Sequence, residues 1–187
     1  MRLDAADLSI HSETLLAVLL GAVLATLSGL VATQFEAHLR RRERERDAAL
    51  LFGELLSTLK VLIDTADRAR GQGDPYGPFT IRMWRAVRRE LDIYDRNREA
   101  LYDLRQAKLR FGTHSLMVRF ALALEGVLDS HEALGSLPDI DAHPRAEPLR
   151  GAREQTFGFL IDNAAEVEAL LAALTKPAGR TFDVRSG

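Results

Sequence analysis

The chain carries five histidines, the side chains best suited to bind a metal ion or to transfer protons near neutral pH. Metal sites in four-helix proteins typically use a Glu-x-x-His spacing, and this spacing does not occur in the sequence. His114 and His131 share one predicted helix but are too far apart along it to bind the same ion. We therefore predict no metal site and interpret the histidines as surface or half-buried residues: His11, His38, His114, His131 and His143.

The other chemistry-bearing residues form no known catalytic pattern. The segment GQGDPYGP, residues 71–78, contains glycines without the spacing of a phosphate-binding loop. Serine, histidine and aspartate are present without a nucleophile-elbow sequence. The absence of cysteine excludes a thiolate nucleophile, a thiolate zinc site and a disulfide scaffold. We predict that the protein is not an enzyme and that it needs no cofactor.

One polar cluster is a candidate binding site. Tyr94, Asn97 and Arg98 lie within a predicted helix, and Arg98 falls on its apolar seam. A buried arginine requires a carboxylate partner or a bound anion. The structural interpretation pairs Arg98 with Glu125 or Asp129 of the next helix, or lets its side chain reach solvent. The functional interpretation makes the cluster a pocket for an anionic ligand.

A run of residues without charge, 14–35, dominates the N-terminal part. At about 1.5 Å per residue this run forms a helix of about 33 Å, enough to cross a hydrocarbon core of about 30 Å. A cleaved signal sequence is the alternative, but it requires a basic leader and a shorter apolar run. The leader, residues 1–13, holds Arg2 against three acidic side chains. We therefore predict a transmembrane helix over residues 14–35.

Basic residues predict the orientation of this helix, because they are retained on the cytoplasmic side of a membrane. A single arginine precedes the run, and five follow it: Arg40, Arg41, Arg42, Arg44 and Arg46. The N-terminus should face outside and residues 36–175 the cytoplasm. The plan resembles that of many small bacterial membrane proteins, which predicts a bacterial inner membrane as the location and transfers no function.

Small side chains recur at every fourth position of the predicted membrane helix: Ala17, Gly21, Ala25, Gly29 and Thr33. Such a stripe lets two helices approach closely, which predicts self-association or contact with another membrane subunit. The alternative is that membrane helices are rich in glycine and alanine in any case. A pore lined by hydroxyl side chains is a weaker hypothesis, because these residues do not share one face: Thr14, Thr26, Ser28 and Thr33.

Apolar residues recur at steps of three and four beyond the arginine run, over residues 48–69, 80–101, 109–134 and 149–174. Loops at 71–78 and 135–148 separate these helices, and Thr80 is a candidate N-cap. The seam changes phase between Leu104 and Leu109, which predicts a break there, with Gly112 as the rival position. We predict an all-α fold in which residues 36–175 form an antiparallel bundle of about four helices and residues 176–187 a mobile tail.

In such a bundle the turn after the second helix should lie near the lipid headgroups, where basic and aromatic residues are favoured. The residues concerned are Arg105, Lys108, Arg110 and Phe111, together with Lys176 and Arg180. The alternative is a polar helix end that faces water. The net charge of the chain is −2, and the sequence shows no basic face that lacks acidic neighbours. We therefore predict no binding of nucleic acid.

Two functional hypotheses follow. The first is a non-enzymatic single-pass membrane protein that acts as a scaffold or accessory subunit, with membrane lipids and either its own copies or another membrane protein as partners. The second is a membrane-anchored sensor or regulator that binds an anionic ligand within the bundle.

Overall fold

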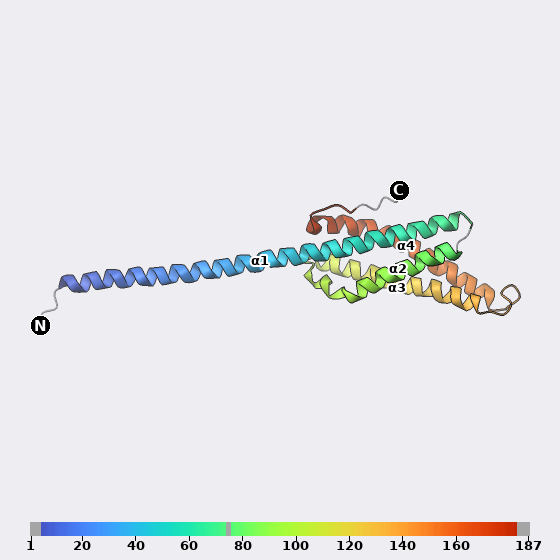
Figure 1. The fold of residues 1–187 in the computed structure, drawn as a ribbon, viewed down its shortest axis with the longest axis horizontal. Coiled ribbons are helices and arrows are strands. Elements are labelled where there is room, and N and C mark those ends of the chain that lie inside the picture. Colours follow the sequence, from blue (N-terminus) through green and yellow to red (C-terminus); the bar gives the residue numbers. More distant parts are fainter. Residues whose placement is uncertain (1–4, 74–75, 183–187) are drawn as a thin grey trace. The chain divides into compact units, whose positions relative to one another are not determined.

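The computed structural model describes residues 5–73 and 76–182, and for residues 5–17 it describes the backbone alone. Within these ranges the regular structure is entirely helical. The helices are α1 (Ala5–Gly71), α2 (Pro78–Arg96), the 3-10 helix η1 (Arg98–Asp103), α3 (Ala107–Gly135) and α4 (Ala146–Ala178) (Figure 1). The prediction of an all-α chain is confirmed.

The chain divides into two compact units, Met1–Glu43 and Arg44–Gly187, and the boundary falls within α1. In the first unit the apolar side chains of α1 are exposed, for example Val18 at 67%, Leu24 at 59% and Phe35 at 62%. Among the described helices, α1 alone is long and apolar enough to cross a membrane, and its apolar window is not buried by any other part of the chain. The side chains of the leader and of Ala17 lie outside the described residues.

Hydroxyl groups in this apolar stretch are satisfied within the helix itself. Thr26 Oγ1 donates to the carbonyl oxygen of Ala22 at 2.8 Å, and Thr33 Oγ1 donates to that of Gly29 at 2.7 Å. Ser28 Oγ donates to the carbonyl oxygen of Leu24 in the same way. These hydroxyls therefore need no water, which lets them lie in an apolar environment.

The second unit, here called the helical unit, has one hydrophobic core to which α1, α2, α3 and α4 all contribute. Its largest fully buried side chains include Phe52, Trp84, Phe120 and Phe157, one from each helix. The rings of Trp84 and Phe157 meet edge to face with centroids 5.0 Å apart. Burial of each such side chain stabilises the fold by about 1.5–3 kcal/mol.

The predicted seams mostly coincide with the buried faces. All seven seam residues of α3 are buried: Leu109, Thr113, Leu116, Phe120, Ala123, Val127 and Leu134. In α1 the seam residues Leu62 and Ala69 are only half-buried, while the flanking Leu56 and Ile63 are fully buried. In α4, Leu171 lies on the buried face at 3% exposure, and its neighbour Leu170 is half-buried.

The segment between the second and third predicted helices differs from prediction. Helix α2 begins at Pro78, not at Thr80, because proline fits the first helical position, where no N–H is needed. It ends at Arg96, and η1 follows before the chain turns at residues 104–106. The predicted break between Leu104 and Leu109 is confirmed, whereas Gly112 lies inside α3 and is not a boundary.

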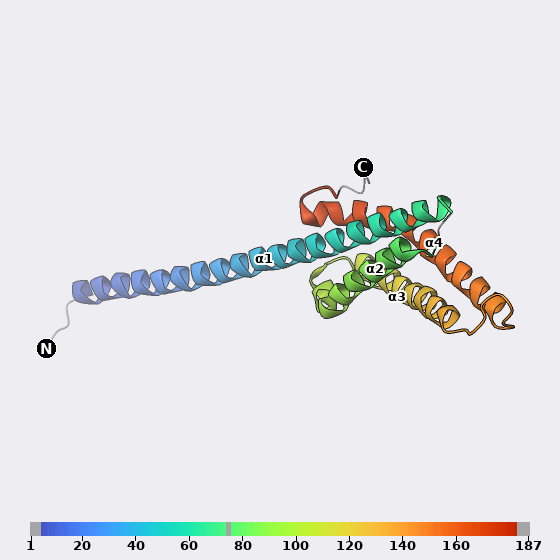
Figure 2. The same ribbon diagram turned by 45° about the vertical axis from the view of Figure 1, so that its right-hand side comes forward.

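Helix α3 lies beside both α2 and α4 (Figures 1 and 2). The approach to α4 is closest at Gly126, where an added Cβ would meet Thr156 Cγ2 at 2.7 Å. Gly126 therefore brings the two helices into direct contact.

The C-terminal segment is also more ordered than predicted. Helix α4 continues through Pro177 to Ala178, which is buried, and ends at Gly179 in the left-handed conformation with φ 71°. Arg180 pairs with Glu54 of α1, and Phe182 packs against the core. Residues 176–178 of the predicted tail thus belong to α4, while residues 183–187 lie outside the described part of the chain.

Candidate functional site

The candidate site is built on a buried pair between α2 and α3. Tyr94 Oη lies 2.6 Å from His114 Nδ1, and Tyr94 is 3% exposed. The ring of Tyr94 also meets that of Phe52 edge to face, with centroids 6.2 Å apart. Burial raises the pKa of Tyr94 to about 12, although the positive charge of Arg98 opposes this shift. The phenol is therefore neutral at physiological pH and shares a hydrogen bond with the imidazole.

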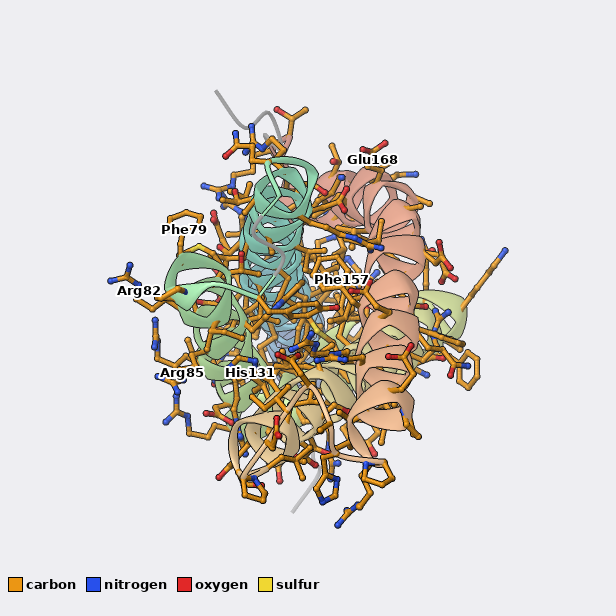
Figure 3. All side chains as sticks on the ribbon, turned by 90° about the vertical axis from the view of Figure 1, so that its right-hand side faces the viewer. Phe79, Arg82, Arg85, His131, Phe157 and Glu168 are labelled. Carbon is orange, nitrogen blue, oxygen red and sulfur yellow. The ribbon has the colours of Figure 1, made fainter. Side chains whose placement is uncertain are left out.

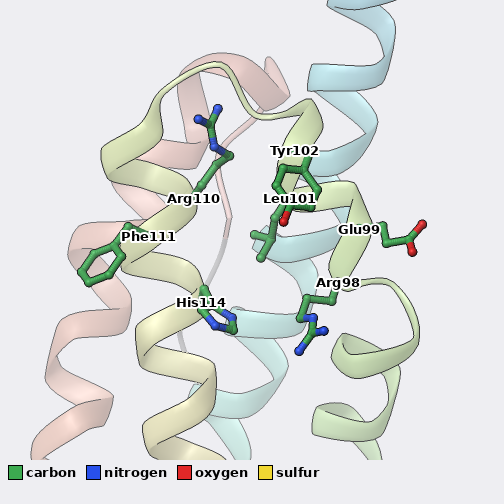
Figure 4. Close-up of a pocket in the computed structure, with 7 residues that line it drawn as sticks. All are labelled: Arg98, Glu99, Leu101, Tyr102, Arg110, Phe111 and His114. Atoms are coloured by element: carbon green, nitrogen blue, oxygen red, sulfur yellow. The ribbon is translucent and has the colours of Figure 1, made fainter.

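A cavity of about 530 Å³ opens next to this pair, between η1 and the first turns of α3. Figure 4 shows its lining, which combines two arginines, one carboxylate and several apolar or aromatic groups: Arg98, Glu99, Leu101, Tyr102, Arg110, Phe111 and His114. Two of these aromatic residues are strongly exposed, Tyr102 at 83% and Phe111 at 73%. The cavity can therefore offer both apolar contact and positive charge.

Arg110 has a structural task at the rim of this cavity. Its Nη1 donates to the carbonyl oxygens of Leu104 at 2.6 Å and of Arg105 at 3.2 Å. These carbonyls end η1 and the turn after it, where the backbone has no helical donor left. Arg110 thus fixes the turn.

Three contacts tie η1 and the same turn to the first residues of the helical unit. Arg105 Nε lies 3.0 Å from Glu45 Oε2, and the Arg105 backbone N–H donates to Glu45 Oε1 at 3.3 Å. Arg44 Nε lies 3.9 Å from Asp103 Oδ1. The turn at residues 104–106, which leads into the first turns of α3 with Lys108 and Phe111, therefore lies next to Glu45 at the start of the helical unit.

The predicted cluster of Tyr94, Asn97 and Arg98 is only partly assembled. Asn97 caps the end of α2, and its Nδ2 donates to the carbonyl oxygen of Ile93 at 2.8 Å. Arg98 is exposed, not buried, because α2 ends before it and η1 turns the chain away from the seam. Within the described part of the chain, Arg98 forms no ion pair with Glu125 or Asp129. The sequence analysis also missed His114 as the partner of Tyr94, because no local signal links the two positions.

The remaining predicted residues lie on open surfaces. Gly21 and Gly29 have nothing within 4 Å of an added Cβ, so the stripe presents a free groove in the single chain. Arg40 pairs with Glu36 at 3.4 Å on the helix surface. Arg41, Arg42 and Arg46 are exposed and have no ion pair with any described carboxylate. Arg180 pairs with Glu54 instead of joining the turn.

Comparison with known protein families, curated proteins and solved structures finds no match to this chain.

A strong polar contact between α3 and α4 was not predicted. Arg119 Nη1 donates to Asn163 Oδ1 at 2.7 Å and to Glu166 Oε1 at 2.8 Å. The hydrogen bond from Arg119 lowers the pKa of Glu166. The sequence gives no sign of this contact, because the identity of the neighbouring helix cannot be derived from local periodicity. We assign this contact to helix register, since its polar atoms satisfy one another.

No group of three or more possible metal ligands occurs among the described residues.

Proposed function

We propose that the protein is a non-enzymatic, single-pass protein of a bacterial inner membrane, in which residues 14–35 span the bilayer. The observation that carries this proposal is the exposure of the apolar side chains from Val18 to Phe35. In water these side chains would forfeit about 1.5–3 kcal/mol each relative to an apolar environment. A lipid bilayer supplies that environment for a helix of this length.

The arginines that follow the span support a cytoplasmic location for the helical unit. Arg41, Arg42 and Arg46 are exposed and unpaired within the described residues, so their charges are available to the membrane surface. We propose that the helical unit forms an antiparallel bundle and acts there as a scaffold or accessory subunit.

Lipid headgroups are the first proposed partner. Tyr102 of η1 precedes the turn at residues 104–106, and Lys108 and Phe111 of α3 follow it. All three side chains are exposed, and this combination of aromatic and basic groups suits the interface between headgroups and acyl chains. The tie of the turn to Glu45 supports this role, because Glu45 follows closely after Phe35 along the chain.

A second copy, or another membrane subunit, is the second proposed partner. The stripe through Gly21, Ala25 and Gly29 offers a groove without side chains that would block a close helix crossing. The satisfied hydroxyl of Thr33 adds no polar cost to such an approach.

Membrane location and orientation are tested together with the full chain. The natural sequence contains no cysteine, so a single cysteine can be introduced by Ser9→Cys or by Ser136→Cys without background labelling. We expect both variants in the membrane pellet after alkaline carbonate extraction. In spheroplasts a membrane-impermeant maleimide should label the Ser9→Cys variant, and it should label the Ser136→Cys variant only after lysis. Full-length protein in the supernatant without detergent would contradict the proposal.

Self-association is tested by native mass measurement after extraction in mild detergent. We expect an assembly larger than the 20.8 kDa chain, which the double substitution Gly21→Ile and Gly29→Ile should reduce. The control, Val23→Ile with Leu27→Phe, adds bulk on the opposite side of the helix and should leave the assembly intact. A 20.8 kDa monomer with no co-purifying subunit would contradict the scaffold role.

The alternative function, a membrane-anchored sensor of an anionic ligand, is favoured by the cavity beside η1. Its guanidinium at Arg98 is exposed and has no ion pair with a described carboxylate, unlike Arg105 at the same turn. Thermal stabilisation by citrate or another small carboxylate that Arg98→Gln abolishes would support this alternative, and unchanged stabilisation in that variant would exclude this cavity.

A further inference from the structure

A second cationic cavity lies at the opposite end of α2. It has a volume of about 460 Å³ and is lined by residues from the chain before α2, from the first turns of α2 and from α3: Tyr76, Pro78, Ile81, Arg82, Arg85 and His131. Figure 3 shows Arg82, Arg85 and His131 on one side of the helical unit. No part of the proposed membrane role depends on this cavity.

The two arginines of α2 are not neutralised within the described structure. Arg82 Nε donates to the carbonyl oxygen of Pro78 at 3.2 Å, and its guanidinium forms no ion pair with a described carboxylate. Arg85 is exposed and likewise has no described carboxylate partner. They lie one turn apart on α2, so both guanidinium groups can reach one ligand.

A third arginine, Arg153, lies next to the cavity, against the lining residue Tyr76. The guanidinium of Arg153 stacks on the ring of Tyr76, 3.4 Å from its centroid, and its Nε is buried without a hydrogen-bond partner. The nearby carboxylate of Glu154 is already shared, since it accepts from Tyr76 Oη at 2.8 Å and pairs with Arg70 at 3.0 Å. Positive charge therefore exceeds negative charge among the described groups around the cavity.

His131 supplies an unused polar atom. Its Nδ1 is buried and has no hydrogen-bond partner within the described structure. Burial lowers the pKa of His131, and the neighbouring charges of Arg153 and Arg85 lower it further. The imidazole is therefore neutral at pH 7 and adds no charge of its own to the cavity.

Aromatic packing holds these groups in place. Tyr76 meets Phe157 edge to face at 6.0 Å, and Phe157 meets the buried Trp84 in the same way at 5.0 Å. The platform for Arg153 is therefore anchored in the core. The first turn of α2 carries no acidic residue that would offset the positive end of the helix dipole.

We propose that this cavity binds a phosphoryl group of a small molecule, held by the guanidinium groups of Arg82 and Arg85 beside the ring of His131. Guanidinium groups bind phosphate oxygens in a planar, two-pronged geometry, which favours a phosphoryl group over a point anion such as chloride. The cavity is large enough for a substituent beyond the phosphoryl group.

The test uses the full chain in mild detergent, with inorganic phosphate and pyrophosphate as probes at ionic strength held constant with potassium chloride. Isothermal titration calorimetry should show saturable binding, and Arg85→Gln should weaken it about tenfold or more, as expected for loss of a charge-assisted hydrogen bond. Arg96→Gln, an exposed arginine in the last turn of the same helix, is the matched control and should bind like the natural protein.

Three outcomes would overturn the proposal. They are no saturable binding of phosphate or pyrophosphate, equal effects of Arg85→Gln and Arg96→Gln on that binding, or equal affinity of the protein for chloride and for phosphate. Because Arg85 is exposed, its substitution should leave the fold intact, and circular dichroism checks this directly. Phosphatidic acid in the same micelles forms a separate arm. If phosphatidic acid at matched concentration competes with the phosphate probes, the phosphoryl group belongs to a lipid headgroup. If it does not compete, the phosphoryl group belongs to a free metabolite.

Discussion

The ring of Phe182 lies over the backbone of Gly53 and fills the space that a Cβ at that position would occupy. The contact joins the end of the described chain to α1, and Arg180 reinforces it by pairing with Glu54. A glycine in the middle of a helix normally costs about 1 kcal/mol relative to alanine. Here its presence lets the segment after α4 dock on the core.

This contact predicts a non-additive pair of substitutions. Gly53→Ala should destabilise the protein because the new methyl group displaces Phe182, and Phe182→Ala should cost about 1–2 kcal/mol in lost burial. In the Phe182→Ala background, Gly53→Ala should instead stabilise by up to about 1 kcal/mol, since only the helix propensity remains. Urea unfolding of the four proteins measures the cycle, and simple additivity would argue against the contact.

Loss of the Tyr94 hydroxyl should cost about 1–2 kcal/mol, because Tyr94→Phe leaves His114 Nδ1 without its hydrogen-bond partner while the ring stays packed. Tyr102→Phe is the control, since this side chain is exposed. In a spectrophotometric titration, the tyrosinate signal that Tyr94→Phe removes should lie near pH 12. If Tyr94→Phe instead removes a tyrosinate signal near pH 10, Tyr94 is open to water.

His131 should make stability depend on pH below neutrality. Its pKa is lower in the folded protein than its ordinary value of 6.5, so the unfolded chain binds the proton more readily. Stability is complete above the ordinary value and falls as the pH drops from there toward the folded pKa. In the His131→Gln variant the thermal midpoint should change less between pH 7 and pH 5.5 than in the natural protein. The neighbouring charged residues Arg85, Arg153 and Glu154 are left unchanged. Parallel curves for both proteins would contradict this assignment.

The pair of Arg119 and Glu166 should make stability depend on pH at lower values than His131 does, because the titrating group is a carboxylate. Because the pKa of Glu166 is lowered, its contribution is present above its ordinary value of 4.5 and is lost as the pH falls through the folded pKa. Glu166→Gln should cost at most about 1 kcal/mol, since the pair is partly exposed. Arg119→Met should cost more, because Asn163 also loses its donor. Equal losses would show that Asn163 finds another partner.

The proposed headgroup contact predicts the depth of single residues in reconstituted vesicles. A Phe111→Trp variant should be quenched by lipids brominated near the headgroup, whereas Leu122→Trp, an exposed site three turns further along α3, should not. The native Trp84 is fully buried and serves as an internal baseline. Equal quenching at positions 111 and 122 would contradict a specific contact through the turn.

Features that depend on local periodicity could be predicted from the sequence. The seam of α3 and the break before Leu109 follow directly from the spacing of apolar residues, which reports which face of a helix is buried. The uncharged run that makes α1 apolar is likewise local. These elements needed no knowledge of which helices are neighbours.

Features that depend on tertiary neighbours could not be predicted in this way. Arg98 was expected to be buried because the α2 seam was extended through η1, and a 3-10 segment changes the direction of side chains at that point. Pro177 was expected to end α4, but burial of Ala178 keeps one more turn docked. The cavity around His131 draws on α2, α3 and the segment before α2, and each residue alone is typical of an ordinary surface.

The core pairs the first helix of the helical unit with the last. Phe52 and Ile63 of α1 share it with Phe157 and Leu174 of α4, which leaves the ribosome after α1, α2 and α3. Until then Trp84 and Phe120 lack part of their cover, so the nascent chain must carry an open apolar face through most of its synthesis. Any chaperone that assists this protein should therefore act during translation, and should be released only once α4 has emerged.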